Sequence, residues 1–147
     1  MNYGIQTTFM NKVLNDYFSG ASNYNVYLGL GLSAEGGQFN MDDFIEPSEE
    51  SGYTKQPFVC GSAVGGVSYN SNEIIFNTAT SNWTVDGKVI DKVGIFNKTI
   101  TKDRTTGEDI ENYDLWCVLP LVPSETVLTG DTVIINANAI RLQLTNK

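Results

Sequence analysis

The chain has 147 residues, with 17 acidic and 9 basic side chains, no histidine, and a formal net charge of -8 at pH 7. A domain this acidic repels the phosphates of nucleic acids and of anionic membrane surfaces, so we expect neither as a partner. The lack of histidine excludes Ser-His-Asp and Cys-His nucleophile systems. Two cysteines without any histidine cannot make a usual structural zinc site either.

The bulk composition is that of one folded domain over residues 1–147, because 41% of the residues are hydrophobic. No stretch approaches the roughly 18 consecutive apolar residues of a spanning helix, which argues against membrane insertion. The first residues mix apolar and polar side chains without the apolar core of a signal peptide, so we expect synthesis in a cytoplasm. In that reducing compartment Cys60 and Cys117 are expected to be buried free thiols, and a disulfide between them stays an open alternative.

The N-terminal stretch predicts one amphipathic helix at about residues 5–18. Apolar residues recur there with the period of one helix face: Ile5, Phe9, Met10, Val13, Leu14, Tyr17 and Phe18. The other face is polar and includes Asn11, Lys12 and Asn15, and Gly20 follows where a C-terminal cap is expected. The apolar stripe docks either on the rest of this domain or on a neighbouring subunit, and the pattern leaves both alternatives open.

Short strands and turns are expected over about residues 24–145. The segment 24–32 predicts a strand with its large apolar side chains on one face, while Gly29 and Gly31 leave the other face open to close packing by another backbone or by an aromatic ring. The segment 88–96 is rich in β-branched and aromatic residues, as in the central strand of a sheet. Further strands are expected at 52–61, 67–69, 73–77, 132–138 and 139–144. A buried strand is expected at 113–121, where Pro120 and Pro123 would end it. This spacing predicts a mainly β fold, an antiparallel, jelly-roll-like sandwich of about eight or nine short strands with one N-terminal helix.

Two long polar segments interrupt the expected strands. Residues 33–51 hold an acidic cluster of Asp42, Asp43, Glu46, Glu49 and Glu50. The cluster lacks the spacing of an EF-hand loop, so a solvated acidic loop is the default and a Ca²⁺ site stays an open alternative. Residues 98–112 predict a second exposed loop of mixed charge, where variation and contacts concentrate. Truncating this loop should leave folding intact and alter contact with a partner.

Four stretches occur in order along nearly the whole chain. The first is the helix followed by NVYLGL, and the second is EPSEESGYTKQPF, similar to an acidic segment before Gly-Tyr-x-[Arg/Lys]-Gln-Pro. The third is similar to an apolar-x-x-Ala-Thr-x-x-Trp pattern followed by Val-Gly-Ile-Phe. The fourth begins with Pro-Leu, continues with Val and Gly-Asp-Thr-Val, and ends in an alternating Ile-x-Leu-x-Leu strand. The matching residues are Glu50, Gly52, Tyr53, Lys55, Gln56, Pro57, Ile75, Phe76, Ala79, Thr80, Trp83, Val93, Gly94, Ile95, Phe96, Pro120, Leu121, Val127, Gly130, Asp131, Thr132 and Val133.

This ordered set resembles a family of small bacteriophage virion proteins often described as tail-fibre proteins. The chain departs from the family pattern at Thr84, where a Gly usually follows the Trp, and in the long, charged segment 98–112. The resemblance implies a non-enzymatic structural component of a virion, a tail- or fibre-associated protein that mediates assembly or attachment. Two alternatives stay open: a capsid decoration protein, and a carbohydrate-binding module that stacks sugars on Trp83 or on tyrosines.

The resemblance also implies partners and a location. The partners are other virion proteins of the capsid or tail, further copies in a symmetric homo-oligomer, and a glycan or protein of the host surface. The protein would be made in the bacterial host cytoplasm and located in the virion. The family brings no catalytic residue, cofactor or metal ligand. The candidate interface residues are Phe9, Val13, Tyr17, Tyr53 and Gln56, and the candidate structural anchors are Trp83 and Phe96.

Overall fold

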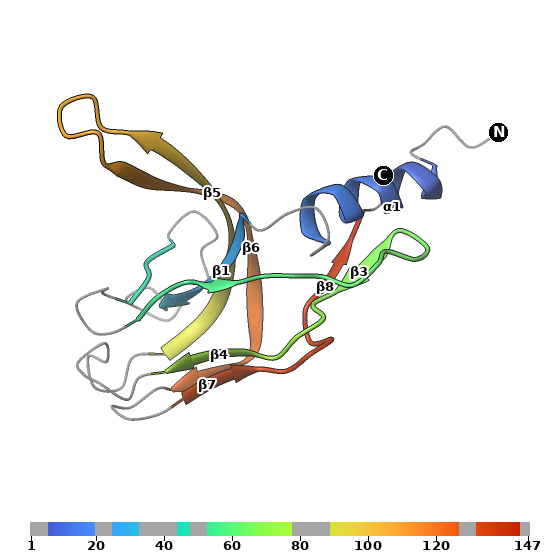
Figure 1. Cartoon of the computed structure of the whole chain (residues 1–147). Helices are drawn as coiled ribbons and strands as arrows, with labels where there is room; N and C mark the ends of the chain where they lie inside the picture. Colours follow the sequence, from blue (N-terminus) through green and yellow to red (C-terminus); the bar gives the residue numbers. More distant parts are fainter. Residues whose placement is uncertain are drawn as a thin grey trace. The chain divides into compact units, whose positions relative to one another are not determined.

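A computed structural model describes residues 6–19, 25–32, 44–47, 53–77, 89–126 and 132–144. In these residues the chain forms one helix and eight strands (Figure 1): α1 (Thr7–Phe18), β1 (Val26–Leu32), β2 (Gln56–Pro57), β3 (Val67–Tyr69), β4 (Ile74–Asn77), β5 (Val89–Lys102), β6 (Asp109–Thr126), β7 (Thr132–Ile135) and β8 (Arg141–Gln143). The prediction of a mainly β fold with one N-terminal helix is confirmed.

The strands form three sheets. One has the order β2-β1-β5-β6, a second pairs β3 with β8, and a third pairs β4 with β7. Pairing is antiparallel between β5 and β6 and between β3 and β8. The four-stranded sheet ends at β2 and β6, so it is an open sheet, and β5 is an interior strand as the sequence predicts.

The chain divides into two compact units. The first comprises Met1–Val26, Pro57–Ile74 and Ile134–Lys147, and the second comprises Tyr27–Gln56 and Ile75–Val133. The expected single domain over residues 1–147 stays a prediction.

In the first unit, α1 packs through Met10 and Leu14, which are 6% and 2% exposed. The helix ends at Phe18, whose ring meets that of Phe58 edge to face at 6.3 Å. Ser19 is the C-cap, in an extended conformation, and its N–H donates to the carbonyl of Asn15 at 3.2 Å. The predicted capping residue Gly20 lies outside the described residues.

The buried side chain of Asn70 holds the turn before β8. Its Nδ2 donates to the carbonyl of Asn136 at 2.9 Å, and its Oδ1 accepts from the N–H of Ile140 at 2.8 Å. Between these two residues lies Asn138, with a φ of 64°. The amide therefore satisfies backbone groups that a left-handed turn leaves without ladder partners.

In the second unit, β1 and β5 pack closely because both carry glycines. A Cβ on Gly29 would lie 2.9 Å from Cε2 of Phe96, and a Cβ on Gly94 would lie 2.7 Å from Cζ of Phe44. The valine and leucines at alternate positions of β1 are all buried. The prediction that an aromatic ring packs over the glycine face of this strand is confirmed.

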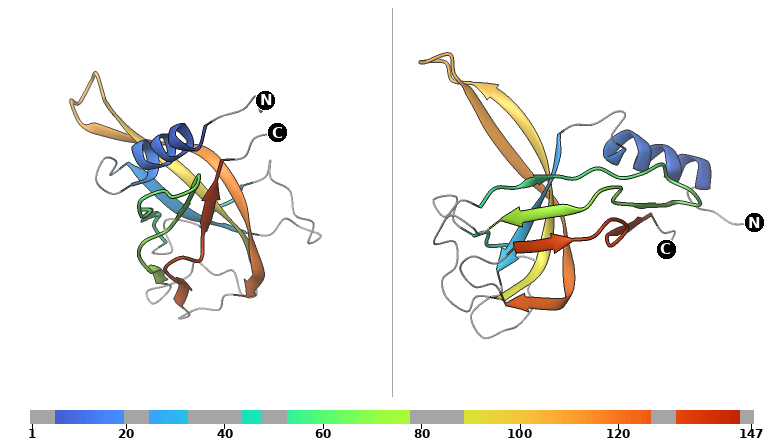
Figure 2. Two further views of the ribbon diagram at one scale, coloured as in Figure 1. Left: turned by 90° about the vertical axis from the view of Figure 1, so that its right-hand side faces the viewer. Right: turned by 60° about the horizontal axis from the view of Figure 1, so that its bottom comes forward.

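The predicted loop at residues 98–112 is wrong, because β5 and β6 continue through it. Thr99 pairs with Asn112 and Lys102 with Asp109, which leaves only residues 103–108 as a turn. The carboxylate of Asp103 accepts from the N–H of Thr105 at 2.7 Å, and Gly107 takes a φ of 73°. Three consecutive β-branched residues, Thr99, Ile100 and Thr101, favour extended pairing here despite the charge. Figures 1 and 2 show this end of the hairpin extending away from β1.

The expectation that Pro120 and Pro123 end a buried strand at residue 121 is also wrong. β6 runs on to Thr126, and it is the edge strand of its sheet, where a missing N–H donor is tolerated. The register shifts between Ile90 and Lys92, which face Glu125 and Pro120, so Pro123 lies in a bulge of β6 and Pro120 lies at its end. With its edge position, β6 is only partly buried.

Candidate interaction surfaces

The apolar stripe predicted on the helix is split between two faces. While Met10 and Leu14 are buried, Phe9 is 56% exposed, Tyr17 is 50% exposed and Val13 is half-buried. These three candidate interface residues are spaced four apart and lie in one row along the helix. They form an exposed apolar row on the first unit.

The polar face of the helix is partly turned inward. The side chain of Asn11 accepts from the N–H of Gly66 at 2.7 Å, and that of Asn15 accepts from the N–H of Ala63 at 2.8 Å. The loop before β3 needs acceptors for these donors, and the two amides provide them. This explains why the helix docks on Met10 and Leu14 and leaves the row of Phe9 outside.

Tyr53 is only 2% exposed, which corrects its prediction as an interface residue. Its hydroxyl accepts from the N–H of Leu30 at 2.8 Å and donates to Oε2 of Glu46 at 2.7 Å. Its ring stacks on Phe76 at 6.0 Å. Gln56, the other candidate in this motif, is half-buried and donates to Thr54. The Gly-Tyr-x-Lys-Gln-Pro motif therefore has an internal role at Tyr53.

Lys55 lies between two aromatic rings of the same unit. Its Nζ is 4.8 Å from the ring centroid of Phe96 and 4.4 Å from that of Tyr113, and it pairs with Oε1 of Glu46 at 3.0 Å. Cation–π contacts and a partly buried ion pair together fix this side chain. Phe96 is buried and contacts Phe44 edge to face, in keeping with its role as an anchor. The other candidate anchor, Trp83, lies outside the described residues.

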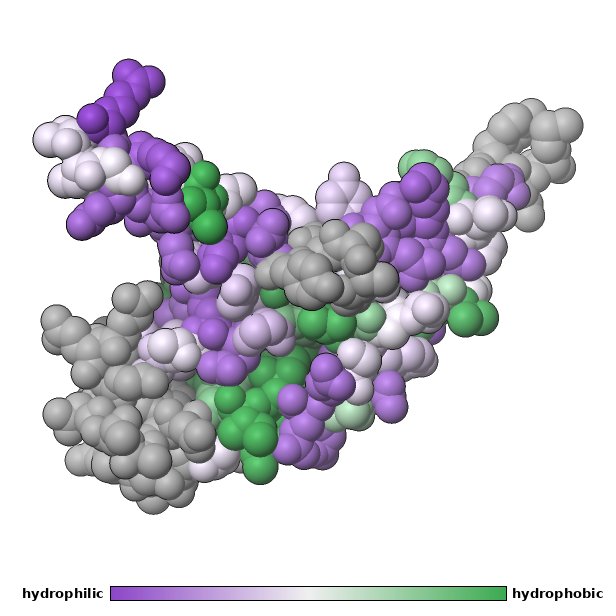
Figure 3. All heavy atoms as spheres, in the orientation of Figure 1, coloured by the Kyte–Doolittle hydropathy of each residue, from purple (hydrophilic) through white to green (hydrophobic). Residues whose placement is uncertain are grey.

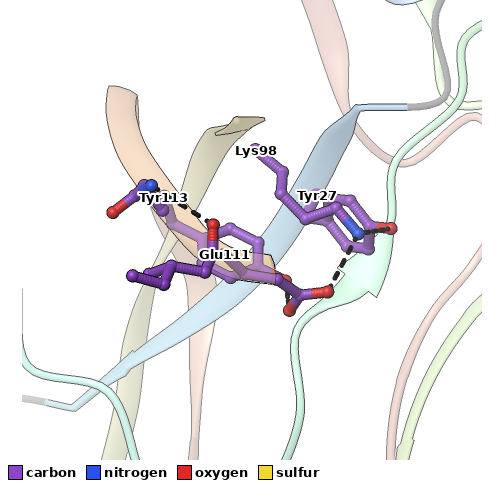
Figure 4. A network of polar contacts seen from close by, with 6 residues as sticks. Tyr27, Lys98, Glu111 and Tyr113 are labelled. Atoms are coloured by element: carbon purple, nitrogen blue, oxygen red, sulfur yellow. Dashed lines mark hydrogen bonds and ion pairs between the residues drawn. The ribbon is translucent and has the colours of Figure 1, made fainter. Parts of the chain in front are cut away.

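A second lysine network joins β1, β5 and β6 (Figure 4). Lys98 donates to the hydroxyl of Tyr27 at 3.2 Å and lies 3.4 Å from Oε1 of Glu111, whose other oxygen accepts from the hydroxyl of Tyr113 at 3.2 Å. The hydrogen bond to Tyr27 raises the pKa of Lys98, and burial, then Glu111, raises the pKa of Tyr113. Lys98 is therefore charged and Tyr113 protonated at neutral pH, the states that these contacts need.

Beyond this network the hairpin forms an arm, which we define as residues 99–112. All of its residues are exposed except Asp103, which is half-buried. Ile100 is 56% and Ile110 42% exposed, and since they pair with neighbouring positions, Glu111 and Thr101, they lie on opposite faces. In Figure 3 this end of the hairpin is mostly hydrophilic with an isolated hydrophobic spot. The arm thus exposes both of its faces.

A buried charged pair lies deeper in the same unit. The Nζ of Lys92, whose side chain is 0% exposed, is 3.6 Å from Oδ1 of Asp91. Among the described residues, this oxygen accepts no hydrogen bond. A pair of this kind compensates its own charges, so we assign it a structural role opposite the β6 bulge.

The acidic cluster and the two cysteines are the remaining candidates for metal binding and thiol chemistry. No group of three or more histidine, cysteine, aspartate or glutamate residues with metal-binding geometry occurs in the part of the chain that the structure describes. Of the acidic cluster only Glu46 is described, and it is engaged with Tyr53 and Lys55. Cys60 and Cys117 are free thiols, the first buried and the second half-buried. Burial raises the pKa of Cys60 to about 11, which makes it unreactive at neutral pH.

Sequence reasoning missed Lys55, Lys98, Glu111 and Tyr113. Lys98 and Glu111 lie in the segment predicted as a loop, whereas Lys55 and Tyr113 lie in segments predicted as strands, and none of the four belongs to a catalytic pattern. One signal was present: Lys98, Ile100 and Lys102 alternate with β-branched threonines, which is the period of a strand. The contacts to Tyr27 and Phe96 depend on strand order and had no local signal.

Two further findings concern membrane-spanning helices and similarity to known proteins. None of the helical residues described here forms a segment long and apolar enough to cross a membrane. No protein-family model, no curated protein and no solved structure matches the chain.

Proposed function

We propose that the protein is a non-enzymatic structural component of a bacteriophage virion, a tail- or fibre-associated protein that mediates assembly or attachment. The observation that supports this most is the arm, residues 99–112. A two-stranded ribbon without a core is marginally stable by itself in water, and ordering it costs conformational entropy. An arm that exposes both faces contributes little to its own unit, whereas it suits a contact with another protein.

The residues that carry the family resemblance support the same proposal indirectly. Tyr53, Lys55 and Phe96 form one interlocked cluster with Glu46, which makes the base of the arm rigid. A rigid base suits a module that is built into a particle. The proposed partners are other virion proteins, further copies of the chain, and a host-surface glycan or protein; the proposed location is the virion, after synthesis in the host cytoplasm.

The copy number of the chain in purified particles tests this proposal. Quantitative mass spectrometry against the major capsid protein should give roughly three to a few dozen copies, as rings and fibres of closed symmetry contain. Copies on the order of hundreds would overturn the tail position in favour of capsid decoration. Absence from the particles would overturn the virion proposal altogether.

A further inference from the structure

The two strands of the arm carry opposite charge. The charged residues of β5 here are Lys102 and, just before the arm, Lys98, while those of β6 are Asp109 and Glu111. The turn between the strands carries charges of both signs, at Asp103, Arg104 and Glu108. Within the hairpin these sides attract each other, since Lys102 pairs with Asp109 at 3.1 Å and Lys98 with Glu111 at 3.4 Å. The hairpin therefore has a basic edge and an acidic edge.

Both edges of the arm are available for further strand pairing. β6 is an edge strand of its sheet. On its other side β5 pairs with β1, which has 7 residues against the 14 of β5, and the arm extends away from β1 (Figures 1 and 2). The arm holds no proline, one of the devices that protect an edge from another strand. Its single lysine, Lys102, discourages an additional strand with like charge and favours one that is acidic.

We propose that the arm joins copies of this chain head to tail, with the β5 edge of one arm added to the β6 edge of the next. In the register of the internal hairpin, Lys102 of one copy would face Asp109 of its neighbour. Pairing of two β6 edges would bring acidic residues together, which disfavours a twofold dimer. A head-to-tail contact builds a ring if its rotation closes and a filament if it does not. The inference rests on the proposed function, because it names a partner for the same arm.

Sedimentation velocity of the purified full chain tests the inference separately from particle copy number. We expect assembly that grows with protein concentration at low salt and weakens at about 1 M salt, where exposed charges are screened within roughly 3 Å. Lys102→Glu and Asp109→Lys should each weaken association about tenfold, the effect of one interfacial charge pair. Arg141→Glu, an exposed charge reversal on β8 in the first unit, should leave it unchanged.

A charge-swapped variant separates a contact between arms from damage to the hairpin. Lys102→Asp combined with Asp109→Lys preserves the internal pair and should assemble as well as the parent chain. It should not co-assemble with the parent, because both mixed junctions place like charges together. Far-UV circular dichroism of each variant checks that the β fold is retained.

Three results would overturn the inference. One is a chain that stays monomeric at about 100 µM and low salt, which leaves no contact tighter than the millimolar range. Another is association that the variants of Lys102 and Asp109 leave unchanged. The third is association lost in the double variant Phe9→Ser, Tyr17→Ser and kept in the arm variants, which would assign the contact to α1.

Discussion

The two halves of the β5–β6 hairpin share a backbone ladder and differ in almost everything else. From Ile90 to Phe96, β5 is largely buried among the glycines of β1 and the ring of Phe44. From Thr99 to Lys102 the same strand is exposed, and its cross-strand contacts are ion pairs and hydrogen bonds. We call the buried half of the hairpin, together with β1 packed against it, the base. Side-chain packing stabilises the base, whereas only strand pairing stabilises the arm.

The contrast implies that the base stabilises the fold and that the arm is the part available for contacts with other molecules. Burial contributes about 25 cal/mol per Å² of apolar surface, whereas an exposed ion pair contributes about 0–1 kcal/mol. Substitutions in the base should therefore change the free energy of unfolding, and substitutions in the arm should change association.

The largest expected effect is that of Gly31→Ala in the base. A Cβ there would lie 2.3 Å from Cγ of Lys92 and 2.7 Å from Cε2 of Phe44, so β1 and β5 must separate. We expect a loss of about 3 kcal/mol in the free energy of unfolding, measured by urea denaturation. Gly61→Ala is the matched control, because its Cβ meets no atom within 4 Å. Equal stability of the two variants would contradict the close packing of the base.

A smaller loss is expected for Tyr53→Phe. The change removes the hydroxyl that links the N–H of Leu30 to Glu46, and it leaves a buried donor without its acceptor. We expect a loss of about 2 kcal/mol in the free energy of unfolding, measured by the same denaturation. Tyr69→Phe, at a position 42% exposed, should change stability by less than about 0.5 kcal/mol. A Tyr53→Phe variant as stable as that control would remove the internal role assigned to the motif.

The sequence predicts the base of the hairpin better than the arm. A run such as Val93–Phe96 is apolar enough to identify a central strand, and the glycines of β1 show where a ring must approach. In the arm, β-branched residues are mixed with six charged side chains, and this polarity favours the prediction of a loop. The continuation of β6 past Pro120 was not predictable either, because edge position follows from strand order.

The candidate site shows the same limit. The period of the apolar residues predicts the row of Phe9, Val13 and Tyr17. Which part of the apolar stripe is buried depends on Asn11 and Asn15, because their side-chain oxygens accept from backbone N–H groups about 50 residues away. The lysine networks likewise join strands that are far apart in sequence. Periodicity reports the face of an element, and tertiary hydrogen bonds decide which face is covered.

Thiol labelling compares base and arm at the level of single side chains. Burial raises the pKa of Cys117, in the base, above its ordinary value of 9.0, whereas a cysteine at exposed Thr101 in the arm should titrate normally. At pH 8 we expect iodoacetamide to label Cys117 at least about tenfold more slowly than the Thr101→Cys thiol, with sites assigned by mass spectrometry.

The pH dependence of this labelling follows from the same shift. Since the folded pKa lies above the unfolded value, the contribution of the protonated thiol to stability is complete below about pH 9 and is lost as pH rises through the folded pKa. Labelling of Cys117 should accelerate over that range. Equal rates at Cys117 and Thr101→Cys at pH 8 would contradict the burial of the base.

The smallest expected effect on stability is that of removing the arm. Replacing residues 100–111 by Asn-Gly joins Thr99 to Asn112, a cross-strand pair, through a two-residue turn. Because the deleted residues are exposed, the free energy of unfolding should change by about 0.5 kcal/mol or less, while self-association is lost. Ile100→Ser combined with Ile110→Ser is the control that keeps the arm and its edge charges, and it should retain association. Unfolding of the shortened chain would show that the arm stabilises the base. It would contradict the assignment of stability to the base and of association to the arm.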